Sequence, residues 1–270
     1  MDGKFEELRG EWALILGGSS GFGQATAIEL ARHGVNVFGV HLDRRATLPN
    51  VDRITAEIRG HDVEAQFFNV NAADHDRRRE TIDRIEQILT GRDHRRIRIF
   101  LHSLAFGALK PLVGTTADES LSSSQIEMTL DVMASSLVYW VQDLAWRELI
   151  GSGSRIFAMT SAGDQRCWPG YGAVSAAKAA LEAYIRQLAL ELAPRGATAN
   201  AIRAGVTDTP ALRKIPGHEI MIENVLRRNP AGRMTTPDDV ARAIAMLSLS
   251  SAQWISGNVI GVDGGEEIVG

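Results

Sequence analysis

Cysteine is almost absent from this chain, since Cys167 is the only one among 270 residues. A single cysteine excludes an internal disulfide and any zinc site built from cysteines, so no metal site is predicted. The first residues, Met1 to Glu7, are charged where a signal peptide would be apolar. No apolar run is long enough to cross a bilayer. We therefore expect a cytoplasmic protein.

An excess of basic charge is also missing, because the formal net charge is −4. Proteins that bind nucleic acid or acidic membranes usually present a basic patch. The one dense basic run, Arg77 to Arg79, is followed by acids, so we expect it to lie in solvent. Hydrophobic residues make up 44% of the chain, enough for a full core. We expect partners that are neither nucleic acids nor membranes.

What the sequence does contain is an alternation of short apolar strands with helical segments. Strands are expected at 12–16, 35–42, 63–70, 97–102, 155–161, 198–204 and 257–265. Helices are expected at 24–33, 76–89, 122–149, 171–193, 219–228 and 236–247. This pattern is typical of a parallel sheet covered by helices on both faces. The length permits one large domain or two small ones, and we predict one Rossmann-type, doubly wound α/β domain over residues 1–270, with a seven-stranded parallel sheet.

A glycine-rich loop, Gly17-Gly-Ser-Ser-Gly-Phe-Gly23, stands between the first strand and the first helix. Glycine allows a tight turn and a close approach of backbone to a ligand, and the amino terminus of a helix favours an anion. Tight turns also produce such strings by chance, but the position after a strand favours nucleotide binding. The predicted phosphate-binding residues are Gly17, Ser19, Ser20, Gly21, Phe22 and Gly23.

The second strand ends at His41-Leu-Asp-Arg-Arg45, where the adenosine ribose of a dinucleotide would lie in a doubly wound sheet. An acid there accepts hydrogen bonds from a free 2′-hydroxyl, whereas arginines attract a 2′-phosphate. Asp43 therefore favours NADH, and Arg44 and Arg45 favour NADPH. A charged surface turn without a ligand is the alternative interpretation.

Tyr171 and Lys178 lie on one stripe of the helix expected at 171–193. Apolar residues recur there at spacings of three and four, which marks a face turned toward the core. A lysine beside a tyrosine can stabilise the anion left when the phenol donates its proton. The alternative is a core tyrosine with a lysine whose ammonium reaches back to solvent.

The pattern loosens between residues 205 and 234, where a short helix is the only regular element expected. Insertions after the carboxyl end of a strand often cover a substrate. We predict a mobile lid over residues 205–234.

Taken together, these motifs resemble the short-chain dehydrogenase/reductase superfamily over nearly the whole chain. Within it, the six residues between Tyr171 and Lys178 are similar to the spacing in bacterial enoyl-acyl-carrier-protein reductases, where ordinary members have three. Ser175 stands where the ordinary spacing would put the lysine. Leu101-His-Ser-Leu-Ala-Phe-Gly107 and Asp131-Val-Met-Ala-Ser-Ser136 also resemble those reductases. The segments at 207–212 and 229–234 resemble their NADPH-using branch.

The resemblance implies site residues that the spacing alone does not give. Ser161 falls at the position of the catalytic serine, beside Tyr171 and Lys178. Met133 replaces an asparagine that helps a water chain reach the lysine in ordinary members, so proton resupply must differ. His102 is expected to support the backbone rather than to act as an acid or a metal ligand. The remaining implied cofactor contacts are Asn69, Val70, His102, Ser103, Lys178, Gly205, Thr207 and Thr209.

The activity implied is reduction of the carbon–carbon double bond of a trans-2-enoyl thioester by NADPH, with NADH as the second possibility. The substrate would be a small-molecule or carrier-protein-bound acyl thioester. A carbonyl or 3-oxoacyl-thioester reductase of the same superfamily is the alternative, and a non-catalytic dinucleotide-sensing protein is a further one. Superfamily members pair equivalent helices, so the apolar helix at 122–149, with Val138, Trp140 and Trp146, predicts a homotetramer.

Overall fold

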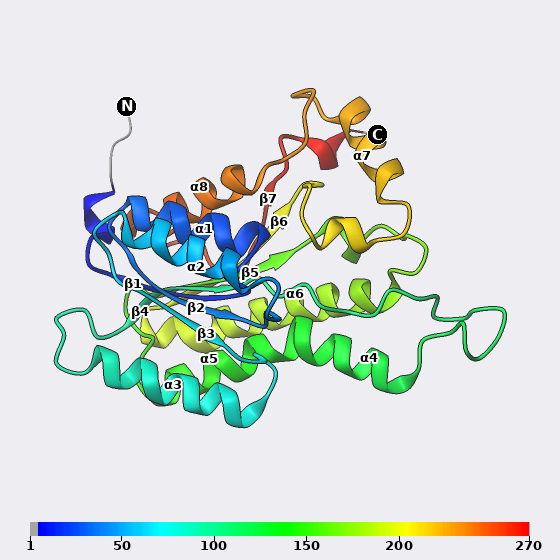
Figure 1. The fold of residues 1–270 in the computed structure, drawn as a ribbon. Helices are drawn as coiled ribbons and strands as arrows, with labels where there is room; N and C mark the ends of the chain where they lie inside the picture. The colour runs from blue at the N-terminus through cyan, green and yellow to red at the C-terminus, as the bar shows by residue number, and fades with distance from the viewer. Residues whose placement is uncertain (1–4, 270) are drawn as a thin grey trace.

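Seven short strands lie side by side and parallel, in the order β3-β2-β1-β4-β5-β6-β7 (Figure 1). The computed structural model describes residues 5–269. The sheet order reverses between β1 and β4, and in such sheets a ligand crevice forms outside the carboxyl ends of the strands at that point. The strands are β1 (Trp12–Leu16), β2 (Asn36–His41), β3 (Ala65–Asn69), β4 (Ile97–His102), β5 (Arg155–Thr160), β6 (Thr198–Ala204) and β7 (Val259–Val262).

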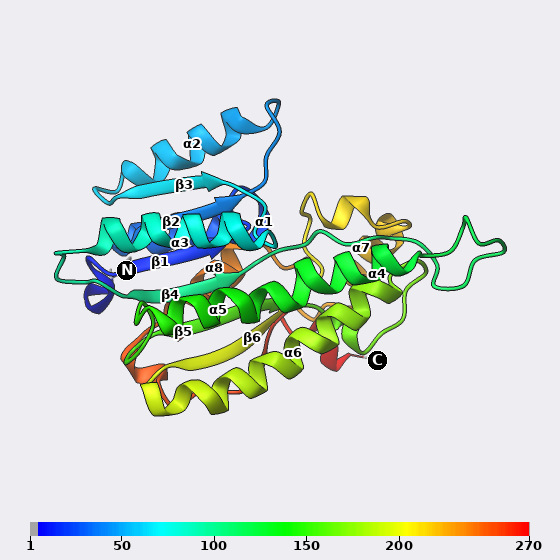
Figure 2. The same ribbon diagram turned by 90° about the horizontal axis from the view of Figure 1, so that it is seen from below.

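Helices cover both faces of this sheet, as the two views in Figures 1 and 2 show. One face carries α1 (Gly21–Arg32), α2 (Leu48–Arg59) and α8 (Pro237–Leu247). The other carries α3 (His75–Leu89), α4 (Ser123–Leu130), α5 (Ser136–Trp146) and α6 (Gly172–Leu192). The remaining helix, α7 (His218–Arg228), stands beyond the carboxyl edge of the sheet. The doubly wound, single-domain fold predicted from the sequence is thereby confirmed.

Helix α2 was not predicted, although its sequence carries the usual signals. Val51, Ile54 and Ile58 are buried at helical spacing, and Pro49 lies in the first turn. The charged residues between them hide this narrow apolar stripe, so the segment resembles a polar connection.

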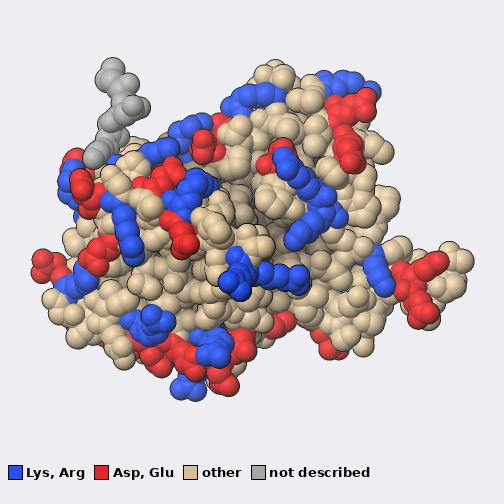
Figure 3. All heavy atoms as spheres, viewed as in Figure 1, with Lys and Arg blue, Asp and Glu red and all other residues tan. Residues whose placement is uncertain are grey.

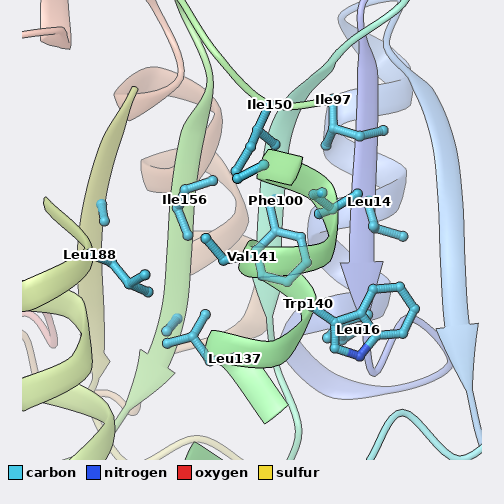
Figure 4. Close-up of a cluster of buried hydrophobic side chains, with 14 of the residues drawn as sticks. Leu14, Leu16, Ile97, Phe100, Leu137, Trp140, Val141, Ile150, Ile156 and Leu188 are labelled. Atoms are coloured by element: carbon cyan, nitrogen blue, oxygen red, sulfur yellow. The ribbon is translucent and has the colours of Figure 1, made fainter. Parts of the chain in front are cut away.

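The core consists of two layers because both faces of the sheet are covered. Every residue of β1 and of β5 is buried, as expected for central parallel strands. On the α5 side, Phe100 of β4 packs among apolar side chains of α5 (Figure 4). Full burial of such a side chain contributes about 1.5–3 kcal/mol relative to exposure. These layers fix the strand ends, on which the site is built.

The helix predicted at 122–149 is not continuous. It consists of α4, one π-helical turn at Asp131–Ser135, and α5, which ends at Trp146. At the junction the Ser136 hydroxyl donates to the Val132 carbonyl at 2.8 Å, and the same oxygen lies 2.8 Å from His102 Nε2. A side chain that inserts into the helical hydrogen-bond ladder is a common cause of such a turn.

Two surface assignments made from the sequence are wrong. Trp140 is fully buried, and its indole N–H donates to the Ala72 carbonyl at 2.8 Å. Arg78, from the basic run expected in solvent, is also buried and pairs with Asp143 at 2.7 Å. Both lie where α3 and α5 pack against each other, so their partners came from segments about 65 residues away in the chain.

Positive and negative side chains are interspersed over the face drawn in Figure 3. Within residues 5–269, no helix combines the length and the apolar character that crossing a bilayer requires.

Trp140→Ala should reduce the free energy of unfolding by about 3–5 kcal/mol, because it leaves a cavity and an unpaired Ala72 carbonyl. Trp254→Ala is the matched control, since Trp254 is 95% exposed, and it should change stability by less than about 0.5 kcal/mol. Urea unfolding followed by circular dichroism measures both values. Equal losses for the two variants would contradict the packing described here.

Candidate active site

A cavity of about 520 Å³ opens at the carboxyl ends of β1, β4, β5 and β6. Its wall is formed by the glycine loop, the segment after β4, the turn after β5, the start of α6 and the segment after β6. Met133, Glu266 and Glu267 complete the wall, so the structure brings together residues from seven separate parts of the sequence. Those predicted from the sequence and found in the wall are Ser20, Gly21, Phe22, Ser103, Ser161, Tyr171, Lys178, Gly205, Thr207 and Thr209.

Lys178 lies in the cavity wall and is only 5% exposed. Its ammonium donates to the Met159 carbonyl, near the end of β5, at 2.7 Å. Burial lowers the pKa of Lys178 to about 8, although the negative charge of Glu182 acts in the opposite direction. The ammonium does not reach back to solvent, so the alternative of a surface-directed lysine is wrong.

Tyr171 occupies the N-cap position of α6, two turns before Lys178 on the same helix. Burial raises the pKa of its phenol, and a hydrogen bond with the Ser161 hydroxyl opposes that shift. Ser161 directly follows β5 and caps the short turn at 162–164 by accepting from the Gly163 amide at 3.3 Å. The phenol and the serine hydroxyl therefore meet in the cavity within reach of one substrate oxygen.

Ser175 occupies the position that the ordinary spacing gives to the lysine. The Ser175 hydroxyl donates to the Gly163 carbonyl, in the turn that follows Ser161. The position thus serves to hold this turn against α6, and the cation comes from Lys178, one helical turn further on.

The glycine loop has the shape expected of a phosphate cradle. Gly17 has φ +85°, and a Cβ there would lie 2.4 Å from the Ser103 carbonyl oxygen. A Cβ at Gly23 would lie 2.2 Å from the Gly17 carbonyl oxygen, so the loop itself requires this glycine. Helix α1 begins at Gly21, three residues earlier than predicted, and its N-cap residue Ser20 makes no side-chain capping bond. Its first amides therefore remain available to an anion.

At the end of β2, the carboxylate of Asp43 interacts with His41 and not with an arginine. Its carboxylate lies 2.9 Å from His41 Nδ1, so it does not orient Arg44 or Arg45. Burial acts to raise the pKa of Asp43, but hydrogen bonds from Thr47, Ser19 and His41 lower it overall. Both arginines are exposed, and within residues 5–269 neither guanidinium makes a hydrogen bond or an ion pair.

Several predicted residues lie outside the cavity wall. Asn69 joins β3 to the end of β2, since its side chain exchanges hydrogen bonds with the Asp43 backbone at 3.0 and 2.9 Å. His102 is fully buried and contacts Ser136, and burial, reinforced by the charge of Lys178, lowers the pKa of its imidazole to about 3. A neutral ring there fits the supporting role expected. The predicted residues outside the wall are Gly17, Ser19, Gly23, Arg44, Arg45, Asn69, Val70 and His102.

Sequence reasoning missed a buried ionic cluster behind the wall. Arg203 of β6 contacts Asp164 and Glu182, and Thr160 donates to Glu182 at 2.8 Å. The available signals were an arginine inside an apolar strand and a glutamate on the buried face of α6, four residues after Lys178. Glu266 was also missed, and its carboxylate lines the cavity and accepts from the Val206 amide at 3.0 Å.

This arrangement agrees with the comparison to known families. A family model described as enoyl-(acyl carrier protein) reductase matches residues 17–267, which include the glycine loop, the cavity wall and the closing strand. The chain belongs to this family. It is therefore a short-chain dehydrogenase/reductase-type oxidoreductase, a class whose members differ widely in substrate.

Individual relatives are about 30% identical to this chain in sequence. An NADPH-dependent aldehyde reductase-like protein of Arabidopsis thaliana is 29% identical, and the match covers 96% of this chain and 94% of the relative. A 1-cyclohexenylcarbonyl-CoA reductase of Streptomyces collinus is 31% identical over 97% of this chain and 88% of the relative. The crystal structure of an NADH enoyl-acyl-carrier-protein reductase of Aquifex aeolicus superposes with a TM-score of 0.83, at 26% identity, and covers 97% of this chain and 98% of that one.

Proposed function

We propose that the protein reduces the carbon–carbon double bond of trans-2-enoyl thioesters with NADPH. The observation that carries this proposal is the pairing of Tyr171 with Lys178 across six residues, while Ser175 holds the turn after Ser161. The relative from Streptomyces collinus, named as a reductase of an unsaturated acyl-CoA, supports the same substrate class.

The glycine loop and the strand ends fit a dinucleotide. The uncapped amides at the start of α1 suit its pyrophosphate, and the absence of a Cβ at Gly17 and Gly23 keeps the loop tight. Gly205, Thr207 and Thr209 line the same cavity and would contact its pyrophosphate or carboxamide. When bound, the nicotinamide would supply the hydride for the β-carbon of the substrate.

Tyr171 and Ser161 would both bind the thioester oxygen, where negative charge develops as the double bond is reduced. A phenol that shares a cavity wall with a buried ammonium is a preorganised donor, which can contribute several kcal/mol to the stability of that charge. Lys178 would keep its charge near the phenol and hold ribose hydroxyls. Since burial lowers the pKa of Lys178 to about 8, this charge is present at neutral pH and lost as the pH rises through that value.

The segment at 205–234 would act as the lid. It supplies Thr207, Thr209, Met221 and Val225 to the cavity wall, and α7 lies beyond the sheet edge. The indole N–H of Trp168 donates to the Pro216 carbonyl at 2.9 Å, so the segment touches the turn that follows Ser161. Closure over an acyl chain would exclude water from the reacting atoms.

A carbonyl or 3-oxoacyl-thioester reductase is the second candidate. It is favoured by the Arabidopsis thaliana relative, which is named as an aldehyde reductase-like protein. Tyr171 would then protonate an alkoxide, and Ser161 would orient the ketone.

The two candidates separate when crotonyl and acetoacetyl thioesters are assayed with NADPH. We expect kcat/KM to be at least about tenfold higher for the crotonyl thioester, because the enolate oxygen and not an alkoxide meets Tyr171. A preference for the acetoacetyl thioester would replace the proposal by the second candidate. NADPH binding without oxidation of either would instead indicate a dinucleotide sensor.

Two variants serve as controls in this assay. Tyr171→Phe should lose most turnover while NADPH binding, followed by fluorescence, persists, because the phenolic oxygen acts on the substrate. Lys178→Ala should impair both. Near wild-type turnover of Tyr171→Phe would remove the phenol from the reaction.

The same assay with NADH tests the cofactor. A charge-assisted contact contributes about 1.5–3 kcal/mol, so Arg44 and Arg45 together should favour NADPH by at least about tenfold. The carboxylate of Asp43 already accepts a hydrogen bond from His41, so it is less available to accept one from a ribose hydroxyl. Arg44→Ala/Arg45→Ala should abolish the preference. A higher kcat/KM of the unchanged protein with NADH would identify Asp43 as the selecting residue.

Oligomeric state is the last part of the proposal. Trp146 is 71% exposed at the end of α5, and Tyr139 and Leu190 are exposed on α5 and α6. Burying these side chains against a second copy would remove apolar surface from water, so we expect a homotetramer. Multi-angle light scattering at micromolar concentration should give four times the chain mass. A monomer mass would contradict the assembly.

A further inference from the structure

Arg203 is a buried cation that the reaction proposed above does not use. It lies near the carboxyl end of β6, pairs in register with Thr160 of β5, and is not part of the cavity wall. Its side chain is 14% exposed. A largely buried guanidinium on an apolar strand is costly unless its partners are well placed.

Those partners come from two elements that carry the site. Nη2 donates to Asp164 Oδ2 at 2.9 Å and to the two oxygens of Glu182 at 3.1 and 3.4 Å. Asp164 belongs to the turn that begins at Ser161, and Glu182 lies one helical turn after Lys178. Turning the Gln165 amide so that its oxygen faces the guanidinium adds contacts at 3.1 and 3.2 Å from the same turn.

The balance of charge makes Arg203 the group that holds the two carboxylates together. Burial, and next the negative charge of Glu182, raise the pKa of the Asp164 carboxyl, while Arg203 lowers it. Without the guanidinium, two buried carboxylates would face each other, and like charges at that distance cannot both stay ionised cheaply. Once both carboxyl groups are ionised, their repulsion would push the turn away from the helix.

We propose that Arg203 is a positioning residue that ties the turn at 161–166 to helix α6 through Asp164 and Glu182, and so fixes Ser161 beside Tyr171 and Lys178. This positioning role rests on the function proposed above only for the identity of the substrate. The geometric link between the turn and the helix exists for any substrate of this cavity.

The decisive variant is Arg203→Met, which keeps an unbranched side chain of similar stem and removes its charge. At low pH one carboxyl is protonated and donates to the other, so the turn stays in place. As pH rises through the raised pKa of the Asp164 carboxyl, the bond is lost and kcat should fall about tenfold relative to wild type, with the KM for NADPH little changed. The wild type should show a smaller fall, because the guanidinium bonds to both carboxylates when they are ionised.

Other titratable and charged groups around this cluster must be separated from the effect. The wild-type profile contains all of them, so only the difference between variant and wild type is assigned to the carboxyl pair. They are His102 of β4, Tyr171 and Lys178 of α6, Arg166 of the turn, and Glu266 and Glu267 near the carboxyl terminus.

Arg203→Met/Asp164→Asn provides the rescue. The amide of the new side chain can donate to Glu182 at every pH, so the double variant should recover at least half of the lost kcat and lose the pH dependence. A merely structural arginine would not give this pattern, because a second substitution in a damaged core would add to the loss.

Arg155→Met is the matched control. Arg155 is 2% exposed on β5 and donates only to backbone carbonyls at the opposite end of the strand. It should lower thermal stability without adding a pH dependence to kcat. If it reproduces the Arg203→Met profile, the effect is general and the positioning role is wrong.

Hydrogen exchange measured by mass spectrometry gives a readout that needs no substrate. Peptides covering residues 161–171 should exchange faster in Arg203→Met than in wild type at high pH, and equally at low pH. If the wild type reduces neither thioester, the proposed function is wrong, but hydrogen exchange still tests whether Arg203 holds the turn. Unchanged exchange would overturn the proposal. Should Arg203→Met not fold, Arg203→Gln decides, because its neutral amide also leaves the two carboxylates without a cation between them and should show the same change.

Discussion

Burial of the Lys178 ammonium is the constraint on which the site depends. A cation removed from water needs a fixed acceptor, and the Met159 carbonyl near the end of β5 provides it at 2.7 Å. That bond sets how α6 lies on the sheet at the carboxyl edge. It also places Tyr171, two turns earlier, over the cavity and next to Ser161. This contact between a side chain and the backbone therefore links the sheet to the helix that carries the phenol.

How much of the structure could be predicted from the sequence depends on whether a feature is set by neighbouring residues or by distant ones. The positions of the strands and the stripe carrying Tyr171 and Lys178 follow from local periodicity, because an apolar face needs a core whatever its partner is. The glycine loop was equally visible, because its glycines and its place between a strand and a helix are local features of the sequence. Boundaries such as the start of α1 at Gly21 were less accurate, because helix ends depend on capping.

What the sequence could not give was the pairing of distant polar groups. Arg78 and Asp143, or Arg203 and Asp164, are separated by many residues, and local sequence does not identify the partner of a buried charge. The break between α4 and α5 has the same origin, since Ser136 meets His102 only after β4 and α5 have packed. Trp140 looked like surface for this reason, because its partner, the Ala72 carbonyl, belongs to another segment.

These hidden pairs bear on how a family with one fold can support different reductions. The residues that meet the substrate oxygen, Tyr171 and Ser161, come from a helix start and from a turn, which are separate pieces of chain. Their relative position is therefore only as rigid as the contacts that join the two pieces. Here those contacts are the Ser175 hydroxyl on Gly163 and the Asp164–Arg203–Glu182 cluster. Small changes behind the cavity wall could thus alter which oxygen, enolate or alkoxide, fits between phenol and serine, without any change in the groups that touch it.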